Sequence, residues 1–137
     1  MDFDGDYYDQ VLSYADLRAN NIDLKYPLQV GLDRFRIPSG SIDDFMNHSC
    51  DPNAGIRLYP HGAIILAIQH IAVNDEITLD YSTHLNNPHE RIACCCGAKS
   101  CRRVIGNFSE LPQDVQQRYL ELRVVGDFAI GARAANA

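Results

Sequence analysis

The chain has 137 residues, the length of one domain with a core of its own. Its formal net charge of −6 argues against a nucleic-acid binder, because such proteins neutralise phosphates with Lys and Arg. The sequence contains neither an apolar run long enough to span a membrane nor a basic, apolar start typical of a signal peptide. We therefore expect an intracellular protein, cytoplasmic by default and not secreted, with no membrane or nucleic-acid partner.

The acidic balance favours a basic protein segment as the partner. The first ten residues contain no base and four acids, namely Asp2, Asp4, Asp6 and Asp9. Such a cluster can attract a Lys-rich ligand, but a solvated and frayed terminus is an equally good interpretation.

The first regular elements are a short helix and a strand. Ser13-Tyr14-Ala15-Asp16 resembles a capping box and predicts a helix over residues 14–19. Apolar and non-apolar residues alternate over residues 28–33, which predicts a half-buried strand that residues 35–37 extend. Pro38-Ser39-Gly40-Ser41 then predicts a turn.

Residues 47–53 read Asn-His-Ser-Cys-Asp-Pro-Asn and are too polar for a core strand. Ser49 and Asp51 can bond to nearby backbone groups, and Pro52 keeps the preceding residue extended. The segment is therefore interpreted as a rigid loop that holds a ligand or metal. A tight surface turn without a ligand is the alternative.

The second half of the chain predicts a hairpin, one more strand and a helix. Residues 55–59 and 63–68 flank a Pro-His-Gly turn and form the hairpin. Residues 76–81 predict a strand with Ile77, Leu79 and Tyr81 on one face and Thr78 and Asp80 on the other. Residues 82–90 predict a loop, and residues 111–122 an amphipathic helix. We expect surface positions for four histidines without an evident partner, which are His61, His70, His84 and His89.

Five cysteines in a chain without a secretory signal indicate metal ligands or reactive thiols. Cys94, Cys96 and Cys101 have the spacing Cys-x-Cys-x4-Cys, and Gly97 permits the tight turn that would bring three sulfurs to one ion. Cys50 is the remaining candidate for a fourth ligand, while Cys95 is too close to its neighbours to join them. The pattern predicts one structural Zn²⁺ per chain, and a redox thiol cluster is the alternative. Bases around the cluster would offset the charge of four thiolates, namely Arg91, Lys99, Arg102 and Arg103.

Three stretches occur in the order of a known family: residues 47–53, then Asp75-Glu76-Ile77-Thr78-Leu79-Asp80-Tyr81, then Cys94-x-Cys96-Gly97-x3-Cys101-Arg102. Together they resemble the C-terminal half of a SET domain followed by a post-SET zinc motif, and the compact bacterial-type versions are the most similar. The resemblance covers about residues 45–105 and implies a protein-lysine methyltransferase.

The resemblance implies a mainly β fold of several short antiparallel sheets, with residues 47–53 threaded as a pseudoknot, a post-SET zinc site and a C-terminal helix. It divides the chain into a SET domain over residues 1–93, a post-SET zinc motif over residues 94–107, and a C-terminal helix and tail over residues 108–137. The Gly-x-Gly element that usually opens the family's domain does not occur before Asn47. We therefore expect the front portion of the domain to be missing.

The resemblance also implies S-adenosylmethionine as the methyl donor, bound by the Asn47 side chain, the His48 backbone and Tyr81. Tyr81 is similar to the family's catalytic tyrosine, while Leu79 and Phe108 would border the lysine channel. Leu79 stands where the family commonly has Phe or Tyr. Because leucine has no hydroxyl to hold a water, we expect multiple methylation of one lysine.

Two functions of different classes are compatible with these motifs. The first is methyl transfer from S-adenosylmethionine to the side-chain amine of a lysine in a basic protein segment. The alternative is a catalytically impaired, zinc-stabilised SET-like interaction module, favoured by the missing front portion. A homo-oligomer in which a neighbouring copy completes the pocket is a further hypothesis.

Overall fold

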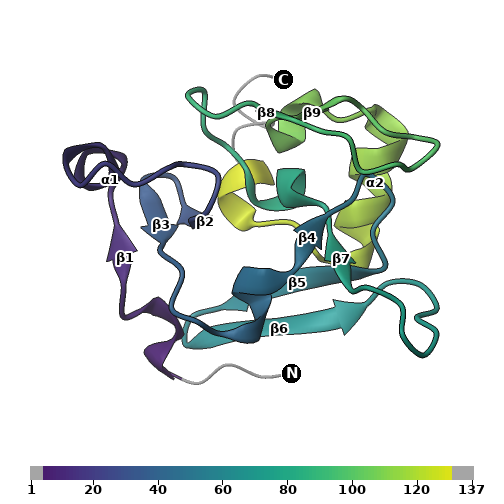
Figure 1. Ribbon diagram of the computed structural model, residues 1–137, viewed down its shortest axis with the longest axis horizontal. Helices are drawn as coiled ribbons and strands as arrows, with labels where there is room; N and C mark the ends of the chain where they lie inside the picture. Colours follow the sequence, from purple (N-terminus) through teal and green to yellow (C-terminus); the bar gives the residue numbers. More distant parts are fainter. Residues whose placement is uncertain (1–4, 131–137) are drawn as a thin grey trace.

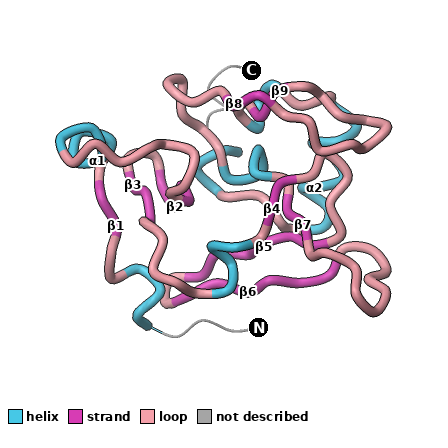
Figure 2. Tube along the Cα trace, in the orientation of Figure 1, coloured by secondary structure: helices cyan, strands magenta, loops and turns pink. Residues whose placement is uncertain are grey.

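The computed structural model describes residues 5–130, in which short strands and helical turns alternate with longer loops (Figure 1; Figure 2). The predicted fold class, mainly short antiparallel sheets with a C-terminal helix, is confirmed. No helix within these residues is long and apolar enough to cross a membrane. With η marking a 3-10 helix, the elements in chain order are η1 Gly5–Tyr8, β1 Val11–Leu12, α1 Tyr14–Ala19, β2 Leu28–Gly31, β3 Arg34–Arg36, η2 Ile42–Phe45, β4 Asn47–His48, β5 Ala54–Tyr59, β6 Gly62–Ala67, β7 Thr78–Leu79, η3 Tyr81–His84, β8 Ile92–Ala93, β9 Val104–Ile105, η4 Phe108–Glu110 and α2 Gln113–Leu122.

The front of the chain forms an antiparallel sheet of order β1-β3-β2, beside α1 on the left of Figure 1. The capping box of α1 is present, because the Ser13 hydroxyl accepts from the Asp16 amide and the Asp16 carboxylate accepts from the Ser13 amide. The expected extension of β2 through Phe35 is wrong. The chain turns at Leu32 and Asp33, and β3 runs back against β2 with Phe35 opposite Gln29.

A buried arginine holds the turn that leads into the polar loop. The Arg36 guanidinium donates to the Asp44 carboxylate at 3.0 Å, the Asp43 carboxylate at 3.3 Å and the Ser41 hydroxyl at 2.7 Å. Its Nε donates to the Tyr7 carbonyl at 2.7 Å. Because all these groups are largely removed from water, the cation and the two acids are satisfied only together, which fixes η2 against β3.

The predicted hairpin is confirmed as β5 and β6, paired from Ala54 opposite Ala67 to Tyr59 opposite Gly62. Its inner side contributes Ile56 and Ala63 to a core cluster that also contains Tyr7, Met46 and Leu79. Gly55 allows a close approach to the C-terminal region, since a Cβ there would lie 2.5 Å from Cγ1 of Val124.

The polar loop and the later strand meet in a parallel pair, the one exception among the described sheets, which are otherwise antiparallel. Asn47 lies opposite Thr78 and His48 opposite Leu79, near the centre of Figure 1. The strand predicted over residues 76–81 has only two residues, because the Asp80 side chain accepts from the Ser82 amide at 3.1 Å and starts η3. The threading of residues 47–53 through a loop stays a prediction.

The predicted alternation of faces along this strand is wrong. Ile77 is 39% exposed although Leu79 is buried, and Asp80, expected on the polar face, is also buried. A two-residue strand followed by a helical turn does not maintain the period of two on which the expectation rested.

The C-terminal region contributes two short strands, a helix and a second core cluster. Strands β8 and β9 pair antiparallel, with Ile92 opposite Ile105. The predicted helix is confirmed as α2, which begins after Pro112. A second core cluster joins it to the preceding turn, and its buried members are Phe108, Leu111, Tyr119, Val124 and Ala129.

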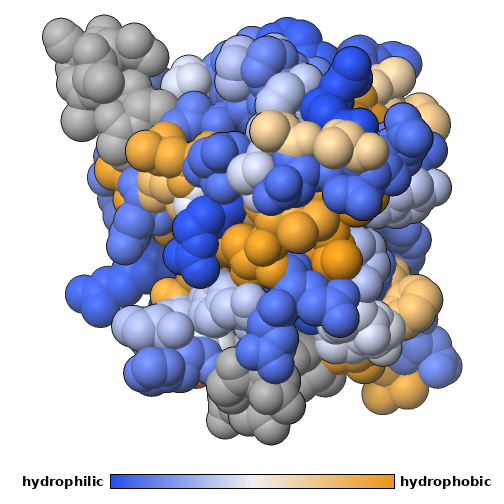
Figure 3. All heavy atoms as spheres, turned by 90° about the vertical axis from the view of Figure 1, so that its left-hand side faces the viewer, coloured by the Kyte–Doolittle hydropathy of each residue, from blue (hydrophilic) through white to orange (hydrophobic). Residues whose placement is uncertain are grey.

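The surface carries an apolar area within polar surroundings. Figure 3 shows apolar side chains near the middle of the face that looks to the left in Figure 1, with polar residues around them. Among the described residues, large apolar side chains that are well exposed include Leu32, Phe45 and Val73. Single exposed apolar side chains are common in folded proteins, so they do not by themselves mark an interface.

Candidate active site and metal centre

Four cysteines from two distant segments form one cluster. The Sγ atoms of Cys50, Cys94, Cys96 and Cys101 all lie within 4.8 Å of one another. The Cys50–Cys94 and Cys94–Cys101 sulfur distances are 3.9 and 3.8 Å. A tetrahedral zinc with Zn–S bonds of about 2.3 Å places its sulfurs about 3.8 Å apart, so the cluster has the size for such an ion. Cys95 is exposed and lies outside it.

Backbone N–H groups point at the sulfurs. The Cys50 amide donates to Cys96 Sγ and the Arg102 amide to Cys50 Sγ, both at 3.4 Å. Hydrogen bonds from the backbone at Cys50 and Ala98 lower the pKa of Cys96 to about 6, whereas burial raises the pKa of Cys94 to about 12. Four neighbouring thiols, of which Cys50 and Cys94 are buried, can lose their protons together only beside a cation, and the donor set therefore fits a soft divalent metal.

His48 connects the cluster to Tyr81. Its Nδ1 accepts from the Tyr81 amide at 3.1 Å, so the proton of the neutral ring belongs on Nε2, which lies 3.4 Å from Cys50 Sγ. Burial lowers the pKa of His48, which favours this neutral form. A sulfur of the cysteine cluster and the amide of the predicted catalytic tyrosine are thus joined through one ring.

Asp80 provides a second connection. Its buried carboxylate accepts from Arg102 Nη2 at 2.8 Å and from the Tyr119 hydroxyl at 2.9 Å. Arg102 directly follows Cys101 of the cluster, and Tyr119 lies on α2. The bases near the cluster therefore differ in role: Arg102 pairs with Asp80, Arg91 pairs with Glu110, and Lys99 and Arg103 are exposed.

Tyr81 is half-buried at the start of η3. Its hydroxyl donates to the Met46 carbonyl, and its ring stands edge-on to His48 with centroids 5.3 Å apart. Burial raises the pKa of Tyr81, and the nearby Glu76 carboxylate acts in the same direction. The phenol is therefore neutral at physiological pH and can serve as a hydrogen-bonding group but not as a base.

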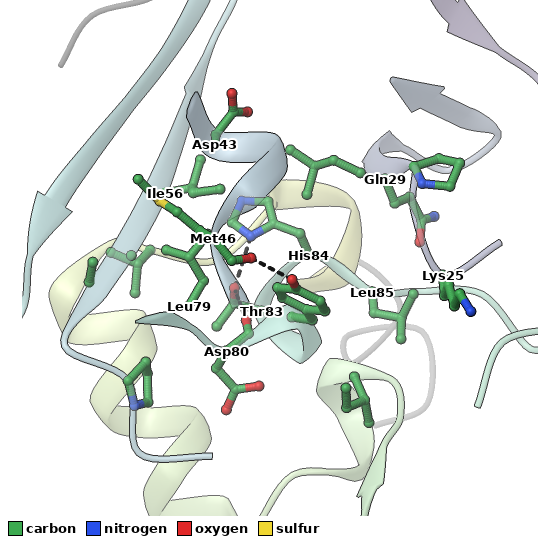
Figure 4. A pocket seen from close by; sticks show the side chains of 18 of the residues that line it. Lys25, Gln29, Asp43, Met46, Ile56, Leu79, Asp80, Thr83, His84 and Leu85 are labelled. Atoms are coloured by element: carbon green, nitrogen blue, oxygen red, sulfur yellow. Dashed lines mark hydrogen bonds between the residues drawn. The ribbon is translucent and has the colours of Figure 1, made fainter. Parts of the chain in front are cut away.

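A cavity of about 110 Å³ opens beside Tyr81. Its apolar wall includes Met46, Leu79 and Leu85, and segments from Lys25 to Val124 contribute to it. Figure 4 shows Leu79 and Met46 on one side of this space and Gln29, Lys25 and Leu85 on the other. The volume is about that of one long side chain and well below the several hundred Å³ of a site for a large cofactor.

The residues predicted for the site are only partly brought together. Leu79 and Tyr81 line the cavity, and their roles in substrate and cofactor binding stay predictions. Phe108 does not line it, because it is fully buried in the core cluster with Tyr119. Asn47 is exposed, and its amide nitrogen donates to Glu76 at 2.6 Å.

Two polar lining residues were not predicted from the sequence. His84, expected at the surface, is 3% exposed because η3 turns it inward, while His61, His70 and His89 are exposed. Glu90 is also buried at the cavity, and burial, together with the Asp23 carboxylate, raises its pKa to about 7. The acids expected to cluster at the terminus fall partly outside the described residues, which include Asp9 but not Asp2 or Asp4.

Comparison with known protein families matches residues 6–82 to the SET domain, which is more than half of the chain. The chain belongs to the SET domain family. The match begins well upstream of residue 45, where the motif resemblance began, and ends before the three clustered cysteines. This SET domain therefore includes the β1-β3-β2 sheet, the hairpin and Tyr81.

Known relatives are named as histone-lysine methyltransferases. The chain is 37% identical over 68 residues to the H3 lysine-4 specific histone-lysine N-methyltransferase of Eremothecium gossypii, covering 46% of this chain and 7% of that protein. It is 36% identical over 70 residues to histone-lysine N-methyltransferase 2B of Homo sapiens, covering 48% and 3%. It is 32% identical over 111 residues to histone-lysine N-methyltransferase mes-4 of Caenorhabditis elegans, covering 72% and 12%. The chain thus spans between 3% and 12% of the length of these relatives.

Proposed function

We propose that this SET domain transfers a methyl group from S-adenosylmethionine to the side-chain amine of a lysine in a protein. The observation that carries the proposal is the position of Tyr81, whose hydroxyl and hydrogen-bonded Met46 carbonyl lie at a cavity of side-chain size. The family membership and the names of the relatives support the reaction class.

The proposed cofactor residues are Asn47, His48 and Tyr81. S-adenosylmethionine would supply an activated methyl group on a sulfonium. The exposed Asn47 carboxamide is held by Glu76 and can bond a ligand at the surface, outside the small cavity. His48 is fixed through its ring to Tyr81 and Cys50, so its backbone is held firmly for the same purpose. The Asn47 side chain and the His48 backbone can thus bond a polar ligand at the β4 side of the β4–β7 pair.

The cavity would receive the lysine. Met46, Leu79 and Leu85 offer an apolar wall to its aliphatic stem and keep water from the amine. The Tyr81 hydroxyl and the Met46 carbonyl would orient the amine, and oxygen atoms there can make weak C–H···O contacts with a methyl group. Most of the rate acceleration would thus come from positioning.

The four cysteines would hold one structural Zn²⁺ per chain. Such an ion closes the cluster as a tetrahedron and supplies folding energy without an open position for a substrate. Through Cys50 it would fix His48, and through Arg102 it would fix Asp80, the two residues that hold the backbone around Tyr81.

The substrate class in this proposal is a basic, lysine-containing protein segment, with a histone tail as the first to test. The net charge of −6 favours such a partner, and the relatives' names refer to histone lysines. An intracellular location is part of the same proposal, since histone-like substrates and reduced cysteines are both found inside cells.

Calorimetric titration with S-adenosylmethionine tests the cofactor part. Micromolar binding that weakens about tenfold or more in Asn47→Ala would support it, since one lost hydrogen bond to a charged ligand has that magnitude. Gln117→Ala, on the exposed face of α2, is the control and should bind as the parent does. No binding at millimolar cofactor would contradict the proposal and favour the interaction module.

Tyr81→Phe tests the catalytic role. We expect a folded protein whose methyl transfer falls by at least about a hundredfold, the usual cost of losing a transition-state hydrogen bond. Tyr59→Phe, on an exposed tyrosine of the hairpin, should keep the parent rate. A Tyr81→Phe protein with the parent rate would refute the assignment.

Leu79 should control the number of methyl groups added. With leucine at this position we expect dimethyl and trimethyl lysine among the products. Leu79→Tyr restores a hydroxyl that can hold a water, and its products should shift toward monomethyl lysine. Mass spectrometry of a lysine peptide measures the products of the parent and of Leu79→Tyr. Only monomethyl lysine from the parent protein would contradict the expectation.

A further inference from the structure

His84 has a ring nitrogen without a hydrogen-bond partner among the described residues. The side chain lines the cavity, and Nε2 is buried without a hydrogen-bond partner among the described residues. Figure 4 shows the ring among the lining side chains, bonded on one side to Thr83. A buried polar atom without a partner is unusual, because it loses its bonds to water without replacement.

The neighbouring bonds determine the tautomer. The Thr83 hydroxyl lies 2.8 Å from the Asp80 carbonyl, which can only accept, so the single hydroxyl proton goes there. The 2.9 Å contact between Thr83 Oγ1 and His84 Nδ1 is then a hydrogen bond only if Nδ1 donates. In the neutral ring, Nε2 is therefore a bare acceptor.

The residues that line the cavity include four acids and one lysine, namely Asp43, Asp44, Asp80, Glu90 and Lys25. Asp43 and Asp44 are paired with Arg36, and Asp80 is paired with Arg102. Lys25 is paired with Asp23, while no cation pairs with Glu90 among the described residues. Nε2 is out of reach of a water-sized molecule, so a donor in the cavity that the ring lines can reach it only when a lining side chain moves.

We propose that His84 Nε2 accepts a hydrogen bond from the amino group of the lysine side chain that enters the cavity, and so selects a primary or methylated amine over an apolar side chain. This inference rests on the proposed function and assigns a specificity role to a residue next to the Tyr81 turn. Met46, whose unbranched side chain adapts easily, can shift to admit the amine.

Two properties support this role. Burial lowers the pKa of His84 to about 4, so the ring stays neutral and keeps its acceptor at physiological pH. The cavity volume of about 110 Å³ has the size of a butylammonium ion, the terminal part of a lysine side chain.

The test uses the parent protein, with the ¹⁵N resonances of the histidine rings followed by long-range NMR. We expect the His84 Nε2 resonance in the range of an unprotonated ring nitrogen. This resonance should shift on addition of n-butylammonium, but not on addition of n-butyl methyl ether, which cannot donate a hydrogen bond. A lysine peptide should reproduce the shift, and the same peptide with norleucine should not. A protonated Nε2, or an Nε2 signal that no amine moves, would overturn the proposal, the latter indicating a buried water as the partner.

Because these spectra need no methyl donor, they stand even if methyl transfer fails. Kinetics provide a second reading: His84→Phe should raise KM for the lysine peptide about tenfold while kcat changes little, as expected for one lost hydrogen bond in binding. His89→Phe, at an exposed histidine, is the control. Unchanged KM in a folded His84→Phe protein would overturn the proposal.

Discussion

The cysteine cluster and the cavity lie on either side of Asp80 and Tyr81, but they are built in different ways. The cluster takes its four cysteines from two short segments, and its sulfurs accept from nearby backbone amides. The cavity is assembled from residues between Lys25 and Val124, and among the described residues His84 Nε2 has no hydrogen-bond partner. In the proposed function, the cluster is satisfied by a cation and maintains the structure, whereas the cavity receives the substrate side chain.

Loss of the metal should be the largest perturbation of the cluster. Cys50→Ser removes one of four ligands, and we expect zinc content to fall far below one per chain and the free energy of unfolding to drop by roughly 5 kcal/mol or more. Cys95→Ser is the matched control, since this exposed thiol lies outside the cluster. Metal analysis and thermal unfolding measure both effects. Equal zinc content in Cys50→Ser and Cys95→Ser would contradict a zinc site that includes Cys50.

The connection between the two regions should be next in size. Arg102→Met leaves the Asp80 carboxylate buried without its cation, which costs about 3–5 kcal/mol. Arg103→Met, at the adjacent exposed arginine, should change stability by no more than about 0.5 kcal/mol. Denaturant unfolding at a fixed zinc concentration compares the free energies of unfolding of the two variants. Equal free energies would show that the buried Asp80 carboxylate does not depend on Arg102.

The cavity should give the smallest effect, and one that depends on pH. Because the pKa of Glu90 is raised to about 7, the folded state favours the protonated carboxyl. Its stabilising contribution is present below the unfolded pKa near 4.5 and is lost as pH rises through 7. We expect Glu90→Gln to be more stable than the parent above pH 7 by about 1–3 kcal/mol, and the difference to shrink toward pH 5.

Unfolding curves across this pH range provide the measurement. The Asp23–Lys25 pair lies nearby and also affects how stability depends on pH. Asp23→Asn is therefore the control that measures the contribution of this pair. A stability difference between parent and Glu90→Gln that does not change with pH would contradict a buried, protonated Glu90.

The cluster could be predicted from the sequence more completely than the cavity, because its residues are closer together in the chain. Cys94, Cys96 and Cys101 are close in the chain, so their spacing alone indicates that they can meet, and the hairpin and α1 follow from local patterns in the same way. His84 was misplaced because its burial depends on Asp80, which caps η3 and ends the strand two residues early. The cap itself is local, because the Asp80 carboxylate accepts from the Ser82 amide two residues later, but the period-two pattern of residues 76–81 favoured a longer strand. The pairing of β4 with β7 has no local signal, since it joins residues about thirty positions apart.

Phe108 illustrates the remaining difficulty. An aromatic residue shortly after the cysteines fits a channel wall by its chemistry, yet it fits a core position equally well, and the structure places it against Tyr119 and Val124. Its assignment to the channel stays a prediction. Leu79, by contrast, lies at the cavity because the parallel pair with β4 holds it there.

The most direct test of the account is mass spectrometry of a lysine-containing histone-tail peptide after incubation with zinc-loaded protein and S-adenosylmethionine. We expect the peptide to gain the mass of one or more methyl groups on lysine, the peptide with norleucine in place of lysine to gain none, and Tyr81→Phe to slow the gain by at least about a hundredfold. A folded, zinc-loaded protein that binds the cofactor but leaves every lysine peptide and intact histone unmodified would contradict the central claim.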